Sequence, residues 1–209
     1  QSLFELSFAT GDKVSSQECS LVRSAQLSKV EADKWKLIAG EAIELQCPKS
    51  LAVQWTGALL RLAGGAEVLR IRVMYSLNKQ EKQDADPPPA PVSLTTLDFD
   101  GTFACSVGGD CLGTSGEVDG SPLIDPNRGL WIAMEHPRAV HGLRQNGTRI
   151  VAELFYPSPG VPYYASLGVT GAVRIDRSDS SEALFLLKRH FRAYLDQVRV
   201  SPVRPLPHY

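Results

Sequence analysis

The stretch ALLRLAGGAEVLRIRVMYSL, residues 58 to 77, is the part of the sequence that decides the fold class. Gly64 and Gly65 separate two apolar runs, and two glycines supply the positive φ angles that a two-residue hairpin turn requires. Polar or flexible side chains alternate in the second run with apolar ones at Leu69, Ile71, Val73 and Tyr75. Because a period of two indicates a strand with one buried face, we expect an antiparallel hairpin here.

Similar patterns along the chain predict further strands. Asn146–Gly147 is the strongest short hairpin signal in the sequence, and it divides the apolar runs of residues 139–156. The sequence WKLIAGEAIELQC, residues 35–47, predicts another hairpin that turns at Gly40. The remaining strands are expected within residues 3–8, 129–135 and 163–176.

Two segments have features of helices. Ser15 and Glu18 have the spacing of a capping box, which predicts a helix within residues 15–35. In residues 181–197 the apolar period changes to three or four residues, which predicts an amphipathic helix. The residues with this spacing are Leu184, Leu187, Phe191, Leu195 and Val198. Because AYLDQVRV also alternates, a long strand is the alternative for this segment.

Many strands joined by tight turns predict a mainly β protein with antiparallel sandwich or barrel-like sheets and one or two helices, an α+β arrangement. Four prolines in QEKQDADPPPAPVS mark residues 81–93 as a Pro-rich linker or exposed loop. This divides the chain into a β-rich N-terminal half, residues 1–80, and a β-rich C-terminal half, residues 94–209, with a helix and an extended tail. The two halves can also form one continuous domain.

The four cysteines predict stabilisation by disulfides. The simplest pairing joins Cys19 to Cys47 and Cys105 to Cys111, although four cysteines allow three pairings. The chain-entropy model assigns about 3–4 kcal/mol to closing the first loop. Disulfides favour a periplasmic or extracellular location. The chain starts at Gln1, which agrees with the expectation that a signal peptide has been removed. The alternative is four reduced thiols in a cytosolic protein.

The composition excludes several classes of function. The formal net charge is -1, so nucleic acid is not an expected partner. The longest apolar run, ALFLL, is far shorter than the roughly 20 residues that a membrane-spanning helix needs. We therefore expect no transmembrane segment.

Residues Asp98, Phe99, Asp100, Gly101 and Thr102 follow a strand-like run. This D-x-D-G-T sequence resembles the first motif of haloacid-dehalogenase-type phosphatases. The resemblance implies that Asp98 is a nucleophile, that Asp100 is a general acid or base, that magnesium is bound, and that the sheet is parallel with alternating helices. It covers only five residues and a strand, and the only lysine after Asp98 is Lys188. The alternative is a strand that ends at a polar turn.

Residues 98–125 contain six acidic residues and no Lys or Arg. Carboxylates in a Gly-rich loop suit calcium, a hard ion that takes six to eight oxygen ligands. The candidate ligands are Asp98, Asp100, Asp110, Glu117, Asp119 and Asp125. The other interpretation is a solvated acidic loop, and no other cofactor is expected.

The C-terminal segment, residues 188–204, is basic, with Asp196 as its only acid. It predicts a surface for a protein partner on the C-terminal helix or the Pro-rich tail. The candidate residues are Arg189, Arg192, Arg199, Arg204 and Tyr209. We therefore expect a non-catalytic, exported binding or assembly protein, a structural component of an envelope, surface or secretion structure. A β-barrel carrier of an apolar small ligand and a magnesium-dependent phosphatase are the alternatives.

Overall fold

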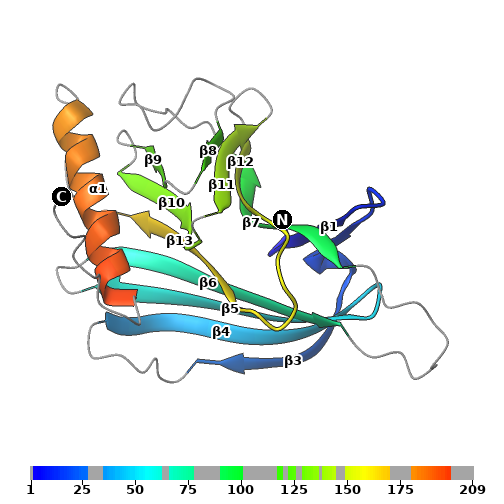
Figure 1. Cartoon of the computed structure of the whole chain (residues 1–209). Coiled ribbons are helices and arrows are strands. Elements are labelled where there is room, and N and C mark those ends of the chain that lie inside the picture. The colour runs from blue at the N-terminus through cyan, green and yellow to red at the C-terminus, as the bar shows by residue number, and fades with distance from the viewer. Residues whose placement is uncertain are drawn as a thin grey trace, which may run out of the picture.

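The fold consists of two antiparallel β-sheets and one long helix in the part of the chain that can be described (Figure 1). A computed structural model describes residues 2–27, 35–62, 66–77, 90–100, 117–119, 122–125, 129–136, 138–144, 149–169 and 180–198. Only the backbone is described for residues 35, 98–100, 117–119, 125, 142–144, 149, 150 and 180–184.

The first sheet has six strands in the order β2-β1-β7-β12-β11-β8. Their bounds are Lys13–Ser15, Glu5–Phe8, Pro91–Asp100, Arg149–Phe155, Ala139–Arg144 and Glu117–Asp119. Leu94 in β7 lies opposite Leu6 of β1 and Leu154 of β12, so one row of leucines crosses three strands. All three side chains are buried.

The second sheet has seven strands in the order β3-β4-β5-β6-β13-β10-β9. Their bounds are Ser20–Gln26, Trp35–Cys47, Leu51–Leu62, Glu67–Leu77, Tyr163–Val169, Leu130–Met134 and Leu123–Asp125. The stretch that decided the fold class contributes to the antiparallel pair of β5 and β6, with Ile71, Val73 and Tyr75 buried as the period of two predicts, while the predicted turn at Gly64 and Gly65 lies outside the described residues. The hairpin of β11 and β12 is also confirmed.

The two sheets pack against each other through a large apolar core. The six-stranded sheet contributes Leu6, Leu94, Ala152 and Leu154, and the seven-stranded sheet contributes Leu51, Val53, Val73, Ile132 and Met134. Full burial of each of the Leu, Val, Ile and Met side chains in this set stabilises the fold by about 1.5–3 kcal/mol. The fold is therefore a sandwich of antiparallel sheets, which confirms the predicted fold class.

Each sheet contains strands from both sides of residues 81–93. In the six-stranded sheet, β7 pairs with β1 and with β12, while in the seven-stranded sheet β6 pairs with β13. Strand β7 begins at Pro91, so its first residues lie within the segment predicted as a linker or loop.

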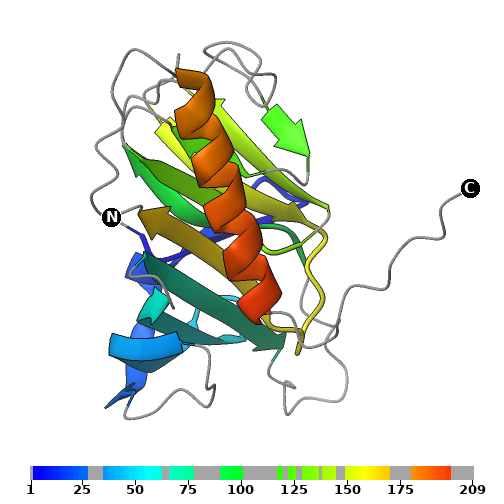
Figure 2. The same cartoon turned by 90° about the vertical axis from the view of Figure 1, so that its left-hand side faces the viewer.

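The helix α1, Ser180–Val198, lies across the outer face of the seven-stranded sheet (Figure 2). Its apolar side forms a second, smaller core with β5, β6, β9 and β10. Leu187 and Tyr194 are fully buried there, and Phe191, Leu195 and Val198 pack beside them. The predicted amphipathic helix at 181–197 is confirmed, and the alternative of a strand is wrong.

Two local predictions are wrong. The capping box of Ser15 and Glu18 is present, but it starts only the 3-10 turn η1, Ser16–Glu18, and the chain then continues as strand β3. The predicted hairpin at Gly40 is instead the continuous strand β4. A Cβ at Gly40 would lie 2.6 Å from Leu27 Cδ1 and 2.9 Å from the carbonyl oxygen of Gly57, so this glycine permits close approach between strands rather than a turn.

Candidate functional site

The outward face of α1 combines an exposed aromatic ring with three positive charges and one negative charge, that of the exposed Asp196. Phe185, Lys188, Arg189 and Arg192 are all exposed, and Phe185 exposes 59% of its surface. Their spacing of three, four and seven residues places them along one side of the helix. We call these four residues the basic face of α1.

Arg189 and Phe185 are neighbours on this face. The guanidinium carbon of Arg189 lies 5.9 Å from the centre of the Phe185 ring, at the outer limit of a cation–π contact. Neither Arg189 nor Arg192 forms an ion pair with a described carboxylate. The charge of this face is local, because the whole chain has a formal net charge of -1.

The opposite side of α1 fixes the orientation of the basic face. The Trp131 ring on β10 lies 4.8 Å from the Phe191 ring and 5.2 Å from the Tyr194 ring, measured between ring centres. Trp131 itself is only 1% exposed. The first pair is edge-to-face and the second is tilted, and an edge-to-face pair stabilises by about 0.5–1.5 kcal/mol beyond its burial. These contacts hold α1 in one rotation about its axis.

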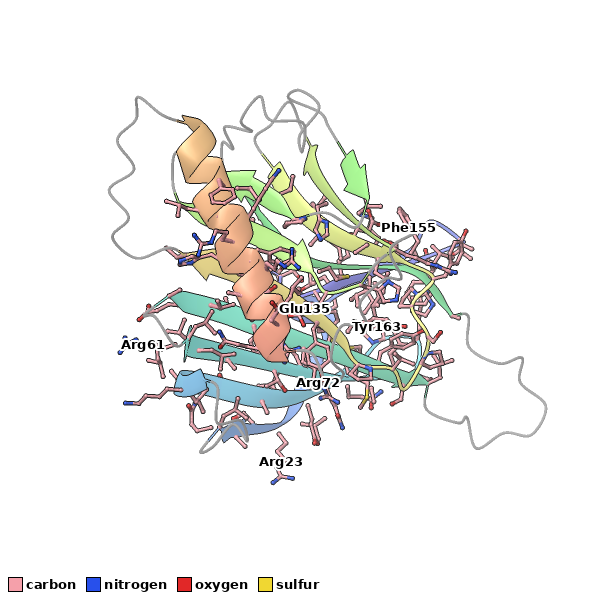
Figure 3. The ribbon with its side chains drawn as sticks, turned by 60° about the vertical axis from the view of Figure 1, so that its left-hand side comes forward. Arg23, Arg61, Arg72, Glu135, Phe155 and Tyr163 are labelled. Atoms are coloured by element: carbon pink, nitrogen blue, oxygen red, sulfur yellow. A yellow bond between two sulfur atoms is a disulfide. The ribbon has the colours of Figure 1, made fainter. Side chains whose placement is uncertain are left out.

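Arg70 and Glu135 form a largely buried ion pair beneath α1. Figure 3 labels Glu135 beside the helix. Arg70 Nε and Nη2 donate to the two carboxylate oxygens of Glu135, at 3.1 and 2.6 Å. The Tyr194 hydroxyl of α1 donates to Oε1 of Glu135. The Arg70 guanidinium also lies 4.1 Å from the centre of the Tyr164 ring. One carboxylate therefore connects the helix to β6.

This buried environment shifts the pKa values of Tyr194 and Arg70. Burial raises the pKa of Tyr194 well above its ordinary value, and the nearby charge of Glu135 adds to this shift. Burial acts to lower the pKa of Arg70, but the hydrogen bond and charge of Glu135 outweigh it and leave the pKa raised. Arg70 therefore stays protonated and Tyr194 remains a hydrogen-bond donor.

The sequence predicted part of this site. Arg189 and Arg192 were candidates and are exposed, whereas Arg199, Arg204 and Tyr209 lie outside the described residues. Phe185 was missed, although its position off the stripe of Leu184, Leu187 and Phe191 is a readable signal. The partner of Arg70 had no such signal, because Glu135 is 65 residues away in the chain.

The two aspartates of the phosphatase-like motif lie at the end of β7. Their side chains are outside the described part of the structure, but both neighbours of β7, namely β1 and β12, run antiparallel to it. A register shift interrupts the pairing with β12, and Leu97, just before Asp98, has a positive φ of 52°. The parallel sheet with alternating helices that the resemblance implies is therefore wrong for this chain.

The acidic residues proposed as calcium ligands are distributed over several elements. Asp98 and Asp100 belong to β7, Glu117 and Asp119 to β8, and Asp125 to β9 of the other sheet. Asp110 lies outside the described residues. Because β12 and β11 separate β7 from β8, these two backbones are about 14 Å apart at the usual strand spacing. Among the described side chains, no three or more His, Cys, Asp or Glu form a group that could hold a metal.

The disulfide Cys19–Cys47 is confirmed, and it joins the residue before β3 to the last residue of β4. Cys105 and Cys111 lie outside the described residues, so their pairing stays a prediction. In the described part of the chain, no helix combines the length and apolar character needed to cross a membrane. Comparisons with protein-family models, with curated proteins and with solved structures each found no significant match.

Proposed function

We propose that this chain is a non-catalytic, exported binding or assembly protein that presents the basic face of α1 to an acidic surface of another protein. The larger structure that it serves belongs to an envelope, a cell surface or a secretion apparatus. One observation carries the proposal: Phe185 is exposed among three cationic side chains on a helix whose other side is fixed to the sandwich.

The chemistry of this face suits protein recognition. Aromatic and arginine side chains are enriched among the residues that contribute most to binding energy. Two arginines and a lysine attract an acidic partner during association, and Phe185 supplies apolar area that leaves water when the complex forms. Because contacts with Trp131 and with the Arg70–Glu135 ion pair hold α1 in place, the helix loses little conformational entropy on binding.

Export is supported by the disulfide. Structural disulfides persist in the periplasm and outside the cell, and they are rare in a reducing cytosol. The Cys19–Cys47 bond closes a 28-residue separation in the sequence and tethers an exposed strand. The pairing state of the cysteines in native material tests this part of the proposal, and four free thiols would contradict it.

The sequence is also compatible with an apolar-ligand carrier and with a phosphatase. The side chains that fill the space between the sheets form a continuous apolar core, which favours a binding surface over an internal site for an apolar ligand. For a phosphatase that uses Asp98 and Asp100, the measurement is magnesium-dependent hydrolysis of an aryl phosphate by the wild type and by Asp98→Asn. Activity that this substitution abolishes would replace the proposal.

The binding proposal is tested with charge-reversal variants. A partner captured from the envelope or extracellular fraction is purified, and its affinity is measured by calorimetry at two salt concentrations. We expect Arg189→Glu and Arg192→Glu each to weaken binding at least about tenfold, and added salt to weaken the wild-type complex. Phe185→Ser should weaken it without changing the salt dependence.

Arg138→Glu is the matched control, because Arg138 is an exposed arginine outside α1. Its charge reversal changes the net charge by the same amount as Arg189→Glu, and it should leave the affinity unchanged. Equal affinity for Arg189→Glu and the wild type, or equal loss in both charge reversals, would contradict a role for the basic face.

A further inference from the structure

The free edges of the two sheets differ greatly in length. Three of the four outermost described strands, β2, β8 and β9, have three residues each, whereas β3 has seven. Short edge strands protect a sheet from pairing with another chain, and a long one invites it. Strand β3 lies at the outer edge of the seven-stranded sheet, as Figure 1 shows.

Strand β3 receives almost no stabilisation from burial, because all seven of its residues are exposed. Leu21 and Val22 are 62% and 66% exposed, respectively. What holds the strand is its backbone pairing with β4 and, at its start, the Cys19–Cys47 bond. Because β3 is already extended, its backbone loses little conformational entropy when it pairs with another strand.

The pairing of β3 with β4 determines which backbone groups are open. Leu27, the residue after β3, donates its N–H to the carbonyl oxygen of Gly40 at 2.8 Å. In an antiparallel pair, alternate residues point toward the partner strand, so residues 23 and 25 also face β4. Ser24 and Gln26 therefore direct their N–H and C=O groups away from the sheet.

We propose that β3 pairs antiparallel with β3 of a second copy of this chain, around a two-fold axis at Ala25. Ser24 of each copy then lies opposite Gln26 of the other. Each of these two pairs exchanges two backbone hydrogen bonds, which makes four in total. The two seven-stranded sheets become one continuous sheet across the interface.

The side chains of β3 select this register. Ala25 is small and lies on the axis, where opposite strands approach within about 4.5 Å between Cα atoms. Arg23 lies opposite Leu27 of the other copy, and the two arginines are separated by about four residues along the strand, roughly 14 Å. A register centred on Arg23 would place two positive charges opposite each other, which destabilises a strand pair.

A bulge limits the pairing at the other end. The register between β3 and β4 shifts between Leu21 and Arg23, which disturbs the outward direction of the backbone near Val22. Pairing centred on Ala25 uses residues 23–27 and leaves this bulge outside. A second copy is the favoured occupant because the same edge segment supplies matching donors and acceptors to both sides, and symmetric dimers of this type are the commonest oligomers. So small an interface makes a weak, reversible dimer.

The test changes only the outward backbone donor. Ser24→Pro removes the outward N–H of each copy, and it leaves untouched the hydrogen bonds that residues 23, 25 and 27 direct to β4. Two of the four intermolecular hydrogen bonds are lost, so the dimer should dissociate roughly thirtyfold more readily. Ser24→Thr keeps the N–H and is the matched control. Sedimentation equilibrium from about 10 µM to about 1 mM of the full chain measures the dissociation constant over the range expected for a weak interface.

Two further measurements keep the result unambiguous. The melting temperatures of the monomeric variants show whether the fold is intact, and Ala25→Arg, which opposes two charges on the axis, weakens the dimer without proline. Hydrogen exchange of the segment 20–27 should slow as the wild-type concentration rises. A wild type that stays monomeric throughout, or a dimer that neither Ser24→Pro nor Ala25→Arg weakens, overturns the proposal.

Discussion

Gly168→Ala is the sharpest test of how the helix is fixed to the sandwich. Gly168 of β13 lies directly opposite Trp131 of β10, and the indole ring covers the glycine. A Cβ at position 168 would lie closer than 3.0 Å to the three nearest ring atoms, a separation that real Cβ atoms essentially never show. The ring has no room to move, because Phe191 and Tyr194 of α1 pack against it.

The expected sign follows from two opposing effects. Without the overlap, alanine in a strand is more stable than glycine by roughly 0.5–1 kcal/mol. Overpacking a well-filled core costs about 1–3 kcal/mol, and the confined indole places this site at the upper end of that range. We therefore expect a net loss of about 2 kcal/mol in the free energy of unfolding. For a chain of this size, that loss lowers the melting temperature by roughly 4–8 °C.

Urea denaturation of four proteins provides the assay: the wild type, Gly168→Ala, Trp131→Phe and the double variant. Trp131→Phe shortens the ring system and itself costs stability through the space that it leaves. In the Trp131→Phe background, Gly168→Ala should cost less than half of what it costs in the wild type, because the overlap is relieved. An additive double variant, or a Gly168→Ala protein as stable as the wild type, would refute the packing account of α1.

Three further perturbations test other contacts. Replacing Cys19 and Cys47 by serine should cost about 3–4 kcal/mol in denaturant unfolding, as a 28-residue separation implies, and an unchanged unfolding midpoint would contradict this. Arg70→Met and Glu135→Leu should each cost about 3 kcal/mol because each removes the ion-pair partner of a largely buried charge, while the double variant costs less than their sum; additive costs would show that the pair is not coupled. Burial and the neighbouring phenol raise the pKa of Tyr75 from 10.0 to about 12, so its contribution to stability is complete below pH 10 and is lost as the pH rises toward 12. Tyr75→Phe should remove that part of the alkaline loss in pH-dependent unfolding, and an identical alkaline profile would contradict the assignment.

Local patterns in the sequence were sufficient for the elements whose structure depends on near neighbours. The alternation at residues 67–77, the Asn146–Gly147 signal and the three-to-four spacing in residues 181–197 each predicted an observed element. Cys19 and Cys47 were paired correctly because they are the two cysteines of the first half of the chain. These features depend on backbone geometry and on which face of one element is apolar.

The errors occurred where local preference and tertiary environment disagree. Ser15 and Glu18 form the capping box that the sequence predicts, yet pairing with β4 and the disulfide keep the following residues extended. Gly40 has the character of a turn residue, but its missing side chain serves the close approach of Leu27 and the Gly57 carbonyl. A glycine has the same local signal in both roles, so only the neighbouring strand distinguishes them.

By itself, the sequence determined that this chain forms antiparallel strands, an amphipathic helix in its C-terminal half and a disulfide in its N-terminal half. Only the tertiary structure decided the order of strands in each sheet, the side of the sandwich that α1 covers, and the exposure of β3 as a long free edge. Contacts such as Arg70 with Glu135 join residues far apart in the chain. The packing of whole sheets decides which residues meet in such contacts. The free energy of burial depends on the total apolar area that is enclosed, and the local sequence does not indicate which strand will enclose it.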